Sequence, residues 1–179
     1  YNVISVAAVD DRGTVSRNDD VIANFSSRGP TPGGRRKPDL AAPGVSIAST
    51  DNSWETTHDF VSYSGTSMAA PHVTGILMLL LQHGVYEPMA QKALLLNTAE
   101  DMGSPGWDAA YGWGYVDLEQ AYFHRDDWFF DEVQATAPDY KLYKGYAYDG
   151  DTATLVWNRR AAYAGSTYPT TYYDLSDLD

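Results

Sequence analysis

A strongly apolar stretch that follows a glycine turn constrains the fold of this 179-residue chain more than any other feature. The stretch from Ser67 to His83 predicts one helix of about 25 Å. Pro71 falls in its first turn, where a missing N–H costs little, and Gly84 follows as a helix-ending residue. Apolar residues lie on every face, which is typical of a helix in a core or in a membrane. Because the unbroken apolar run Ile76–Leu81 is much shorter than the roughly 20 residues of a membrane span, the sequence predicts a buried core helix.

Ser67 stands at the start of this predicted helix, in a position that suits two roles. As an N-cap, its hydroxyl would accept a hydrogen bond from a backbone N–H of the first turn. As a nucleophile, it would benefit from the tight turn that Gly65 permits. The unpaired N–H groups and the positive dipole of the first turn could then stabilise an oxyanion beside it. Position alone favours the N-cap role.

The residues around Ser67 favour the second role. Gly65–Val73 reads G-T-S-M-A-A-P-H-V, which resembles the nucleophile motif G-T-S-M-A-x-P-H-V of subtilisin-like serine proteases, the subtilase family. The Gly-x-Ser-x-Gly turn of α/β-hydrolases is excluded because Ala69 replaces the second glycine. Four further segments resemble subtilase segments in the family's order: Val3–Asp10, Asn24–Pro30, Lys37–Val45 and Gly112–Asp117.

This resemblance implies a fold and an activity. The expected fold class is α/β, with residues 1–123 as the C-terminal portion of a subtilisin-like parallel-sheet domain that contains a buried nucleophile helix. The implied activity is peptide-bond hydrolysis through an acyl-enzyme at Ser67, whose own N–H is an oxyanion donor. The implied substrates are proteins or peptides, no cofactor is required for catalysis, and the family's habit implies secretion.

The resemblance also implies that parts of the active site lie outside this chain. The subtilase strings D-[ST]-G and H-G-T-H, which carry the triad Asp and His, do not occur here. None of His58, His72, His83 and His124 has the context of the catalytic base, and Asn24 lacks that of the oxyanion asparagine. We therefore expect an N-terminal half of the catalytic domain as a partner, and no activity from this chain alone. A non-catalytic scaffold or binding module, or a subunit that completes a split active site, remain as alternatives.

Composition limits the remaining function classes. The formal net charge is −12, with 24 acidic and 12 basic residues, which disfavours a nucleic-acid partner. The chain has no cysteine, so thiol catalysis, thiolate metal sites and disulfides are excluded. No membrane partner is expected, because no apolar run is long enough for a span.

Shorter patterns predict the elements that flank the long helix. Residues 3–9 are nearly all apolar, as in a buried parallel strand, and residues 45–49 predict a second short strand. Turn-forming residues predict a loop over 28–38, and Pro88 opens a second helix that extends to Ala99.

The composition changes after residue 123, where tyrosines become frequent and helical patterns end. Residues 140–148 and 152–157 predict two strands joined by a turn at 149–151, and 152–159 resembles a strand of jelly-roll domains found in some subtilases. Residues 124–179 are therefore expected to begin an appended, truncated all-β domain. Calcium is a candidate structural ion there, with oxygen ligands from Asp149 and Asp151 or from Asp174, Asp177 and Asp179, although solvated turn aspartates are the favoured explanation of the pattern.

Overall fold

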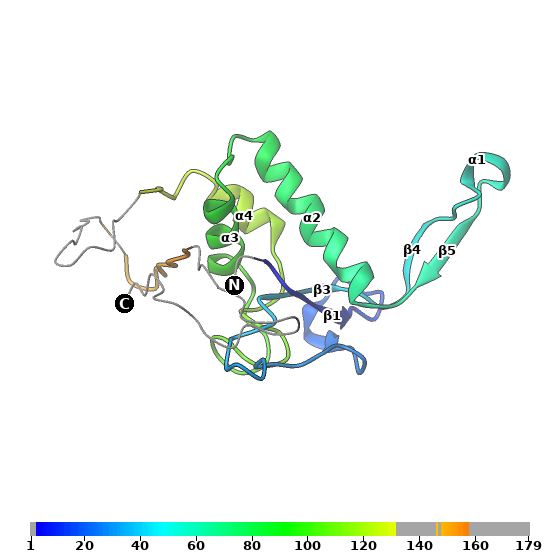
Figure 1. Cartoon of the computed structure of the whole chain (residues 1–179), viewed down its shortest axis with the longest axis horizontal. Helices are drawn as coiled ribbons and strands as arrows, with labels where there is room; N and C mark the ends of the chain where they lie inside the picture. The colour runs from blue at the N-terminus through cyan, green and yellow to red at the C-terminus, as the bar shows by residue number, and fades with distance from the viewer. Residues whose placement is uncertain (1–2, 132–145, 147, 158–179) are drawn as a thin grey trace, which may run out of the picture.

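The computed structural model describes residues 3–131, 146 and 148–157 (Figure 1). Within this part there are five strands and four α-helices, with four strands before the first helix and three helices after the last strand, and a short 3-10 helix, η1 (Arg17–Asp19), precedes the second strand. The arrangement is a mixed α/β fold, in which helix α2 packs on a small three-stranded sheet.

The central sheet is built around β1 (Val6–Asp10), which begins three residues later than the sequence predicts. It pairs in parallel with β3 (Leu40–Pro43), from Val6 opposite Leu40 to Val9 opposite Pro43. Its last two residues also pair antiparallel with β2 (Val21–Ile22). The near-continuous burial of β1 and β3 agrees with the apolar composition expected of parallel strands.

Helix α2 (Thr66–Gln82) confirms the long helix predicted from the sequence to within one residue at each end. His83 is its C-cap residue and Gly84 follows with φ +98°, a left-handed conformation that glycine adopts without strain. The helix packs on β1 and β3 through a stripe of buried residues spaced by one and then two turns, Ala69, Val73 and Leu80.

The prediction that this helix is buried all round is wrong within the described part of the chain. The side opposite the sheet leaves Met78 65% exposed and Leu81 45% exposed. A helix that is apolar on every face needs cover on every face, and the described residues provide it on one side.

Two further helices complete the core. Helix α3 (Pro88–Asn97) begins after the capping residue Glu87 and ends two residues before the predicted end at Ala99. Helix α4 (Leu118–Phe123), which the sequence analysis did not predict, begins after its N-cap residue Asp117, whose side chain accepts a hydrogen bond from the Gln120 N–H. Four of the largest fully buried side chains lie where these helices, α2 and the sheet meet: Leu40, Leu80, Leu95 and Val85. Val9 is equally buried, in a second cluster with Ala7, Ala41 and Tyr115.

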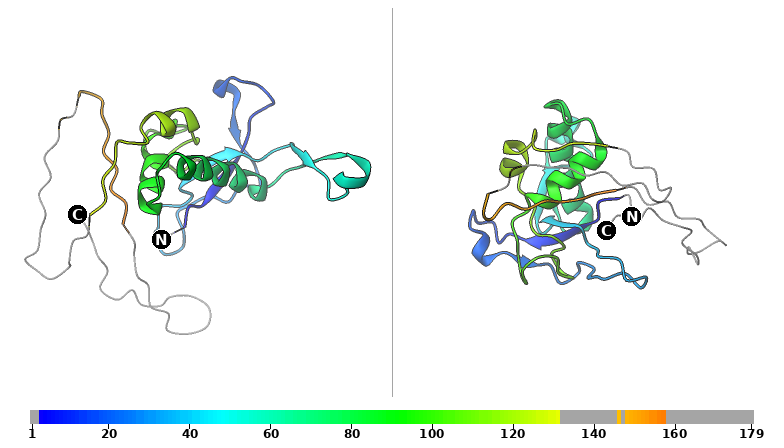
Figure 2. Two further views of the ribbon diagram at one scale, coloured as in Figure 1. Left: turned by 90° about the horizontal axis from the view of Figure 1, so that it is seen from above. Right: turned by 90° about the vertical axis from the view of Figure 1, so that its left-hand side faces the viewer.

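A two-stranded arm leads into α2. Strand β4 (Ile47–Thr50) pairs antiparallel with β5 (Phe60–Tyr63), and the short helix α1 (Trp54–Thr57) lies between them at the tip. Figures 1 and 2 show the arm extending away from the helices and the central sheet. Because β5 ends just before Gly65, the arm and the helix start share one turn.

After residue 123 the structure describes residues 124–131, 146 and 148–157, and the all-β domain expected there stays a prediction. Asp151 N–H donates to the Tyr148 carbonyl at 3.1 Å, and Gly150 has φ +96°, so the predicted turn is present. Residues 152–157 form no strand within the described part of the chain, and most of the expected partner strand, 140–148, lies outside the described residues. The calcium candidates Asp174, Asp177 and Asp179 also lie outside them.

Candidate active site around Ser67

Ser67 is the second residue of α2, and it is exposed to solvent. The first hydrogen bond of the helix joins Met68 N–H to the Gly65 carbonyl at 2.9 Å. Ser67 N–H precedes this bond, and therefore belongs to the donors at a helix start that have no acceptor within their own helix. The N-cap residue is Gly65, which has no side chain to cap the helix, so the structure does not use Ser67 as the N-cap.

The turn before Ser67 is fixed against the end of β3. Gly65 N–H donates to the Gly44 carbonyl at 2.7 Å, and Gly44 N–H donates to the Val9 carbonyl at 2.8 Å. A methyl group built on Gly44 would lie 2.6 Å from the Ala8 Cβ and 2.9 Å from the Gly65 carbonyl oxygen. The absence of a side chain at Gly44 therefore lets β1 and the Ser67 turn approach each other closely.

His72 is the histidine nearest to Ser67 in sequence, but it is engaged elsewhere. Its Nδ1 lies 2.9 Å from the Met68 carbonyl oxygen, one turn earlier in the same helix. Five residues along an α-helix also place His72 and Ser67 on different sides of it. This agrees with the structural role that the resemblance implies for His72.

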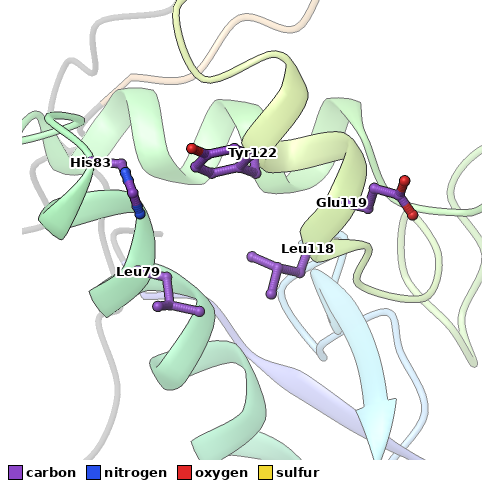
Figure 3. A pocket seen from close by; sticks show the side chains of 5 residues that line it. All are labelled: Leu79, His83, Leu118, Glu119 and Tyr122. Carbon is purple, nitrogen blue, oxygen red and sulfur yellow. The ribbon is translucent and has the colours of Figure 1, made fainter.

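The other histidines lie in three separate regions. His58 follows α1 near the tip of the arm, and His124 contacts Asp127 Oδ2 at 2.8 Å beyond α4. His83 is at the opposite end of α2 from Ser67, with its ring edge-on to Tyr122 at 4.9 Å between centroids. Figure 3 shows the apolar cavity there, of about 410 Å³, whose lining residues are Leu79, His83, Leu118, Glu119 and Tyr122.

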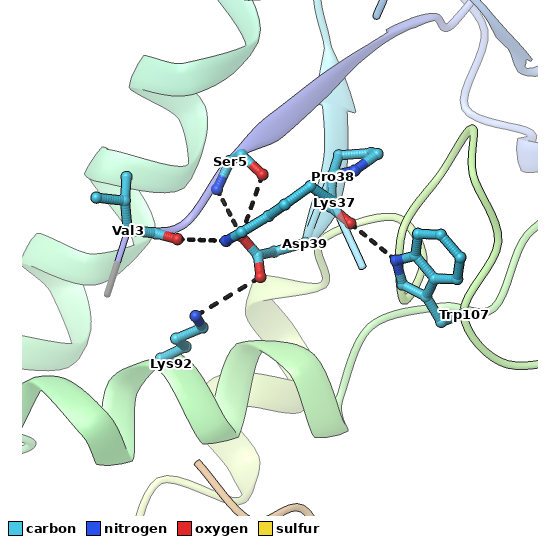
Figure 4. Close-up of polar contacts among 7 residues, drawn as sticks. All are labelled: Val3, Ser5, Lys37, Pro38, Asp39, Lys92 and Trp107. Carbon is cyan, nitrogen blue, oxygen red and sulfur yellow. Dashed lines mark hydrogen bonds and ion pairs between the residues drawn. The ribbon is translucent and has the colours of Figure 1, made fainter. Parts of the chain in front are cut away.

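A buried ion cluster holds the scaffold beneath α2 together (Figure 4). Asp39, at the start of β3, accepts hydrogen bonds from the Ser5 N–H at 2.7 Å and the Ser5 hydroxyl at 3.2 Å. Lys37 Nζ contacts both Asp39 Oδ2 and the Val3 carbonyl, and Lys92 Nζ of α3 lies 3.6 Å from Asp39 Oδ1. One carboxylate therefore connects the start of β1, the start of β3 and helix α3.

Burial lowers the pKa of Lys92, whose side chain is largely enclosed, whereas the nearby Asp39 carboxylate acts in the opposite direction. The sequence analysis quoted Lys37 and Asp39 as part of a family segment but did not predict the buried Lys92. In the sequence of α3, Lys92 lies among apolar residues, and this pattern could have indicated that its side chain is buried.

No metal site accompanies these groups in the described part of the chain. Among residues 3–131, 146 and 148–157, no three His, Asp or Glu side chains are arranged to hold a metal ion. Asp151, an earlier calcium candidate, instead accepts a hydrogen bond from Tyr148 N–H at 2.6 Å. None of the described helices has the length and apolarity needed to cross a membrane.

The fold and the site thus define an α/β domain with an exposed serine at the start of a helix that packs on parallel strands. The model of the subtilase family matches residues 1–114, and the chain belongs to this family.

Similarity to individual proteins agrees with this assignment. The chain is 39% identical over 129 residues to the serine protease AprX of Bacillus subtilis, an alignment that covers 66% of the chain and 29% of AprX. It is 40% identical over 136 residues to fervidolysin of Fervidobacterium pennivorans, covering 66% of the chain and 18% of fervidolysin. The chain therefore spans less than a third of the length of these relatives.

Solved structures show the same likeness. The crystal structure of fervidolysin, a keratinolytic enzyme related to subtilisin, matches with a TM-score of 0.53 and 37% identity, over 67% of this chain and 19% of that one. The CspB protease of Clostridium perfringens matches with a TM-score of 0.59 and 31% identity, over 71% of this chain and 27% of that one.

Proposed function

We propose that this chain is the C-terminal part of the catalytic domain of a serine endopeptidase, and that Ser67 is its nucleophile. The observation that carries the proposal is the position of Ser67, exposed in the first turn of α2 within a G-T-S-M-A-A-P-H-V segment. The bond from Gly65 N–H to the Gly44 carbonyl fixes the backbone just before it. A nucleophile gains from such a rigid support.

In this mechanism the Ser67 Oγ attacks the scissile carbonyl carbon while a histidine takes the hydroxyl proton. The Ser67 N–H donates to the oxyanion that forms on the carbonyl oxygen. Collapse of the tetrahedral intermediate expels the amine, which receives the proton from the histidine, and leaves an acyl group on Ser67. Water then hydrolyses the acyl-enzyme. The substrates of this reaction are proteins or peptides.

We propose that the histidine, the aspartate that orients it and a second oxyanion donor come from an N-terminal half of the catalytic domain. Two observations support such a partner: the exposed apolar side of α2, and the small share of AprX and fervidolysin that the chain spans. This chain by itself is then inactive.

Secretion of the intact protein completes the proposal. A relative that is 49% identical over 59 residues is an extracellular serine protease of Serratia marcescens, and no described helix of this chain could span a membrane. Catalysis by the groups above requires no cofactor.

An active-site label tests the role of Ser67. A fluorophosphonate reacts with an activated serine hydroxyl, so the full-length protein should be labelled, and the Ser67→Ala variant should lose both the label and peptide hydrolysis, by at least about 10⁴-fold in kcat. Ser62→Ala, which removes an exposed hydroxyl from β5, is the matched control and should remain labelled.

Other outcomes of this experiment identify the alternatives. A full-length protein that is not labelled at Ser67 would indicate a non-catalytic scaffold or binding module. Labelling that requires a separately encoded chain would indicate a split active site. Peptide hydrolysis by purified residues 1–179, abolished by Ser67→Ala, would contradict the need for any partner.

A further inference from the structure

The segment that follows the catalytic portion returns to contact α3. Thr152 and Thr154 donate their hydroxyl hydrogen bonds to the same acceptor, Asn97 Oδ1, at 2.9 Å and 2.7 Å. Asn97 is the last residue of α3, more than fifty positions earlier in the sequence. In Figure 1 the described part of this segment is drawn in orange.

The spacing of the two threonines explains how both reach one oxygen. In an extended segment, residues i and i+2 lie on the same side of the backbone. Thr152 and Thr154 therefore face Asn97, whereas Leu155 is 60% exposed. The next two residues, Val156 and Trp157, are half-buried.

A local turn prepares this segment for docking. Asp151 N–H donates to the Tyr148 carbonyl, Asp151 Oδ2 accepts from Tyr148 N–H, and Gly150 takes a left-handed conformation. This turn directs the chain immediately before Thr152. A segment that is ordered in advance loses less conformational entropy when it binds.

Helix α3 is a firm anchor for the contact. Its Gln91 side-chain amide donates to the Val85 carbonyl at 2.7 Å and to the Leu77 carbonyl of α2 at 3.4 Å, and Lys92 reaches the Asp39 cluster. The helix end that holds Asn97 is thus joined to the elements that support Ser67.

We propose that Asn97 is an intramolecular docking site for residues 148–157, and that this contact latches the C-terminal segment onto the helix pair α2–α3. The latch does not depend on whether Ser67 is catalytic.

Hydrogen-exchange mass spectrometry on the full-length protein tests the latch directly. Asn97→Leu removes the acceptor, and Thr152→Val with Thr154→Val removes both donors while keeping their shapes. Each change should speed amide exchange over residues 148–157 by roughly fivefold, the effect of losing net hydrogen-bond stabilisation. Combining the two sets should add little, because both remove the same contact.

Conservative variants supply the controls. Asn97→Asp keeps an acceptor oxygen, and Thr152→Ser with Thr154→Ser keeps both donors, so both should exchange like the parent. Asn52→Leu, at an exposed turn of the arm, should leave residues 148–157 unchanged. Unchanged exchange in the Thr→Val variant, or fully additive effects of the two sets, would overturn the proposal. If Asn97→Leu impairs folding, the threonine variants still test the proposal, because both threonines are exposed and their replacement should not disturb the core.

Discussion

At the scale of single residues, Gly44 controls how closely the Ser67 turn approaches the sheet. An added methyl would overlap both the Ala8 Cβ and the Gly65 carbonyl oxygen. We expect Gly44→Ala to lower the free energy of unfolding of the full-length protein by about 1–3 kcal/mol, because tightly packed backbone must move. Peptidase activity should fall further than stability alone explains, since the displaced backbone is the turn that leads to Ser67.

Gly75 provides the matched control for this prediction. A methyl built there meets nothing within 4 Å, and the residue lies in the middle of α2. In purified residues 1–179, where this side of α2 is exposed, Gly75→Ala should therefore raise the free energy of unfolding by roughly 0.5–1 kcal/mol through higher helix propensity, whereas Gly44→Ala should lower it. Thermal unfolding of both variants separates the steric effect from the general effect of replacing glycine. Equal stability of the Gly44 and Gly75 variants would contradict this interpretation.

Lys92 should make the free energy of unfolding depend on pH in the alkaline range. Burial lowers its pKa in the folded state below the ordinary value of 10.5, so over that interval the unfolded chain binds more protons than the folded one. The free energy of unfolding should then rise as the pH increases from the folded pKa towards 10.5, and Lys92 should contribute no slope at lower pH. Lys92→Met should remove this rise, while Lys37 and Ser5 continue to contact Asp39.

Tyr115 titrates in the same alkaline range with the opposite sign. Burial raises its pKa, so its own contribution falls as the pH increases. The quantity to measure is therefore the difference in unfolding free energy between the parent and Lys92→Met at successive pH values. A difference that does not change with pH would show that the amine titrates normally.

At the scale of elements, sequence patterns predict those parts of the fold that depend on local signals. The bounds of α2 follow from its glycine turn, its apolar run and Gly84, all close in sequence. The strand β3 is harder to recognise, because four residues next to Pro38 and Pro43 resemble a loop. Helix α4 is equally short, although the capping Asp117 was a usable signal.

The environment of a residue is less accessible to such reasoning than its secondary structure. Ser67 could be selected from its motif, whereas its support by Gly44 depends on β3 and the arm meeting in space. The burial of Lys92 could not be predicted, because its counterion, Asp39, is distant along the chain and meets it only in the folded structure. The contact of Thr152 and Thr154 with Asn97 could not be predicted from the local β pattern, because it joins residues more than fifty positions apart.

At the scale of the whole molecule, the side of α2 that is exposed in this chain should be buried in the full-length protein, where we propose that an N-terminal half covers it. Met78 and Leu81 lie one turn apart on that side. In purified residues 1–179, Met78→Lys with Leu81→Lys should raise the protein concentration at which aggregation begins, because an apolar patch is removed. In the full-length protein the same pair should reduce the free energy of unfolding by about 3 kcal/mol or more, because two unpaired charges would be buried.

Val15→Lys is the control for this comparison, because Val15 is fully exposed in a loop. It should alter neither the aggregation of residues 1–179 nor the stability of the full-length protein by more than about 0.5 kcal/mol. If the Met78 and Leu81 pair were tolerated equally well in both proteins, this side of α2 would be a true surface.

The bond between Gly65 and Gly44 also has a consequence for the order of folding. The pairing of β1 with β3 joins residues far apart in sequence, which is a slow, non-local step, whereas α2 and α3 are contiguous and can form early. The Gly44 carbonyl is in place only after that pairing, so the Ser67 turn is completed late. Under the proposal that Ser67 is the nucleophile, we expect its reactivity to return at the last stage of refolding, after the collapse that precedes it.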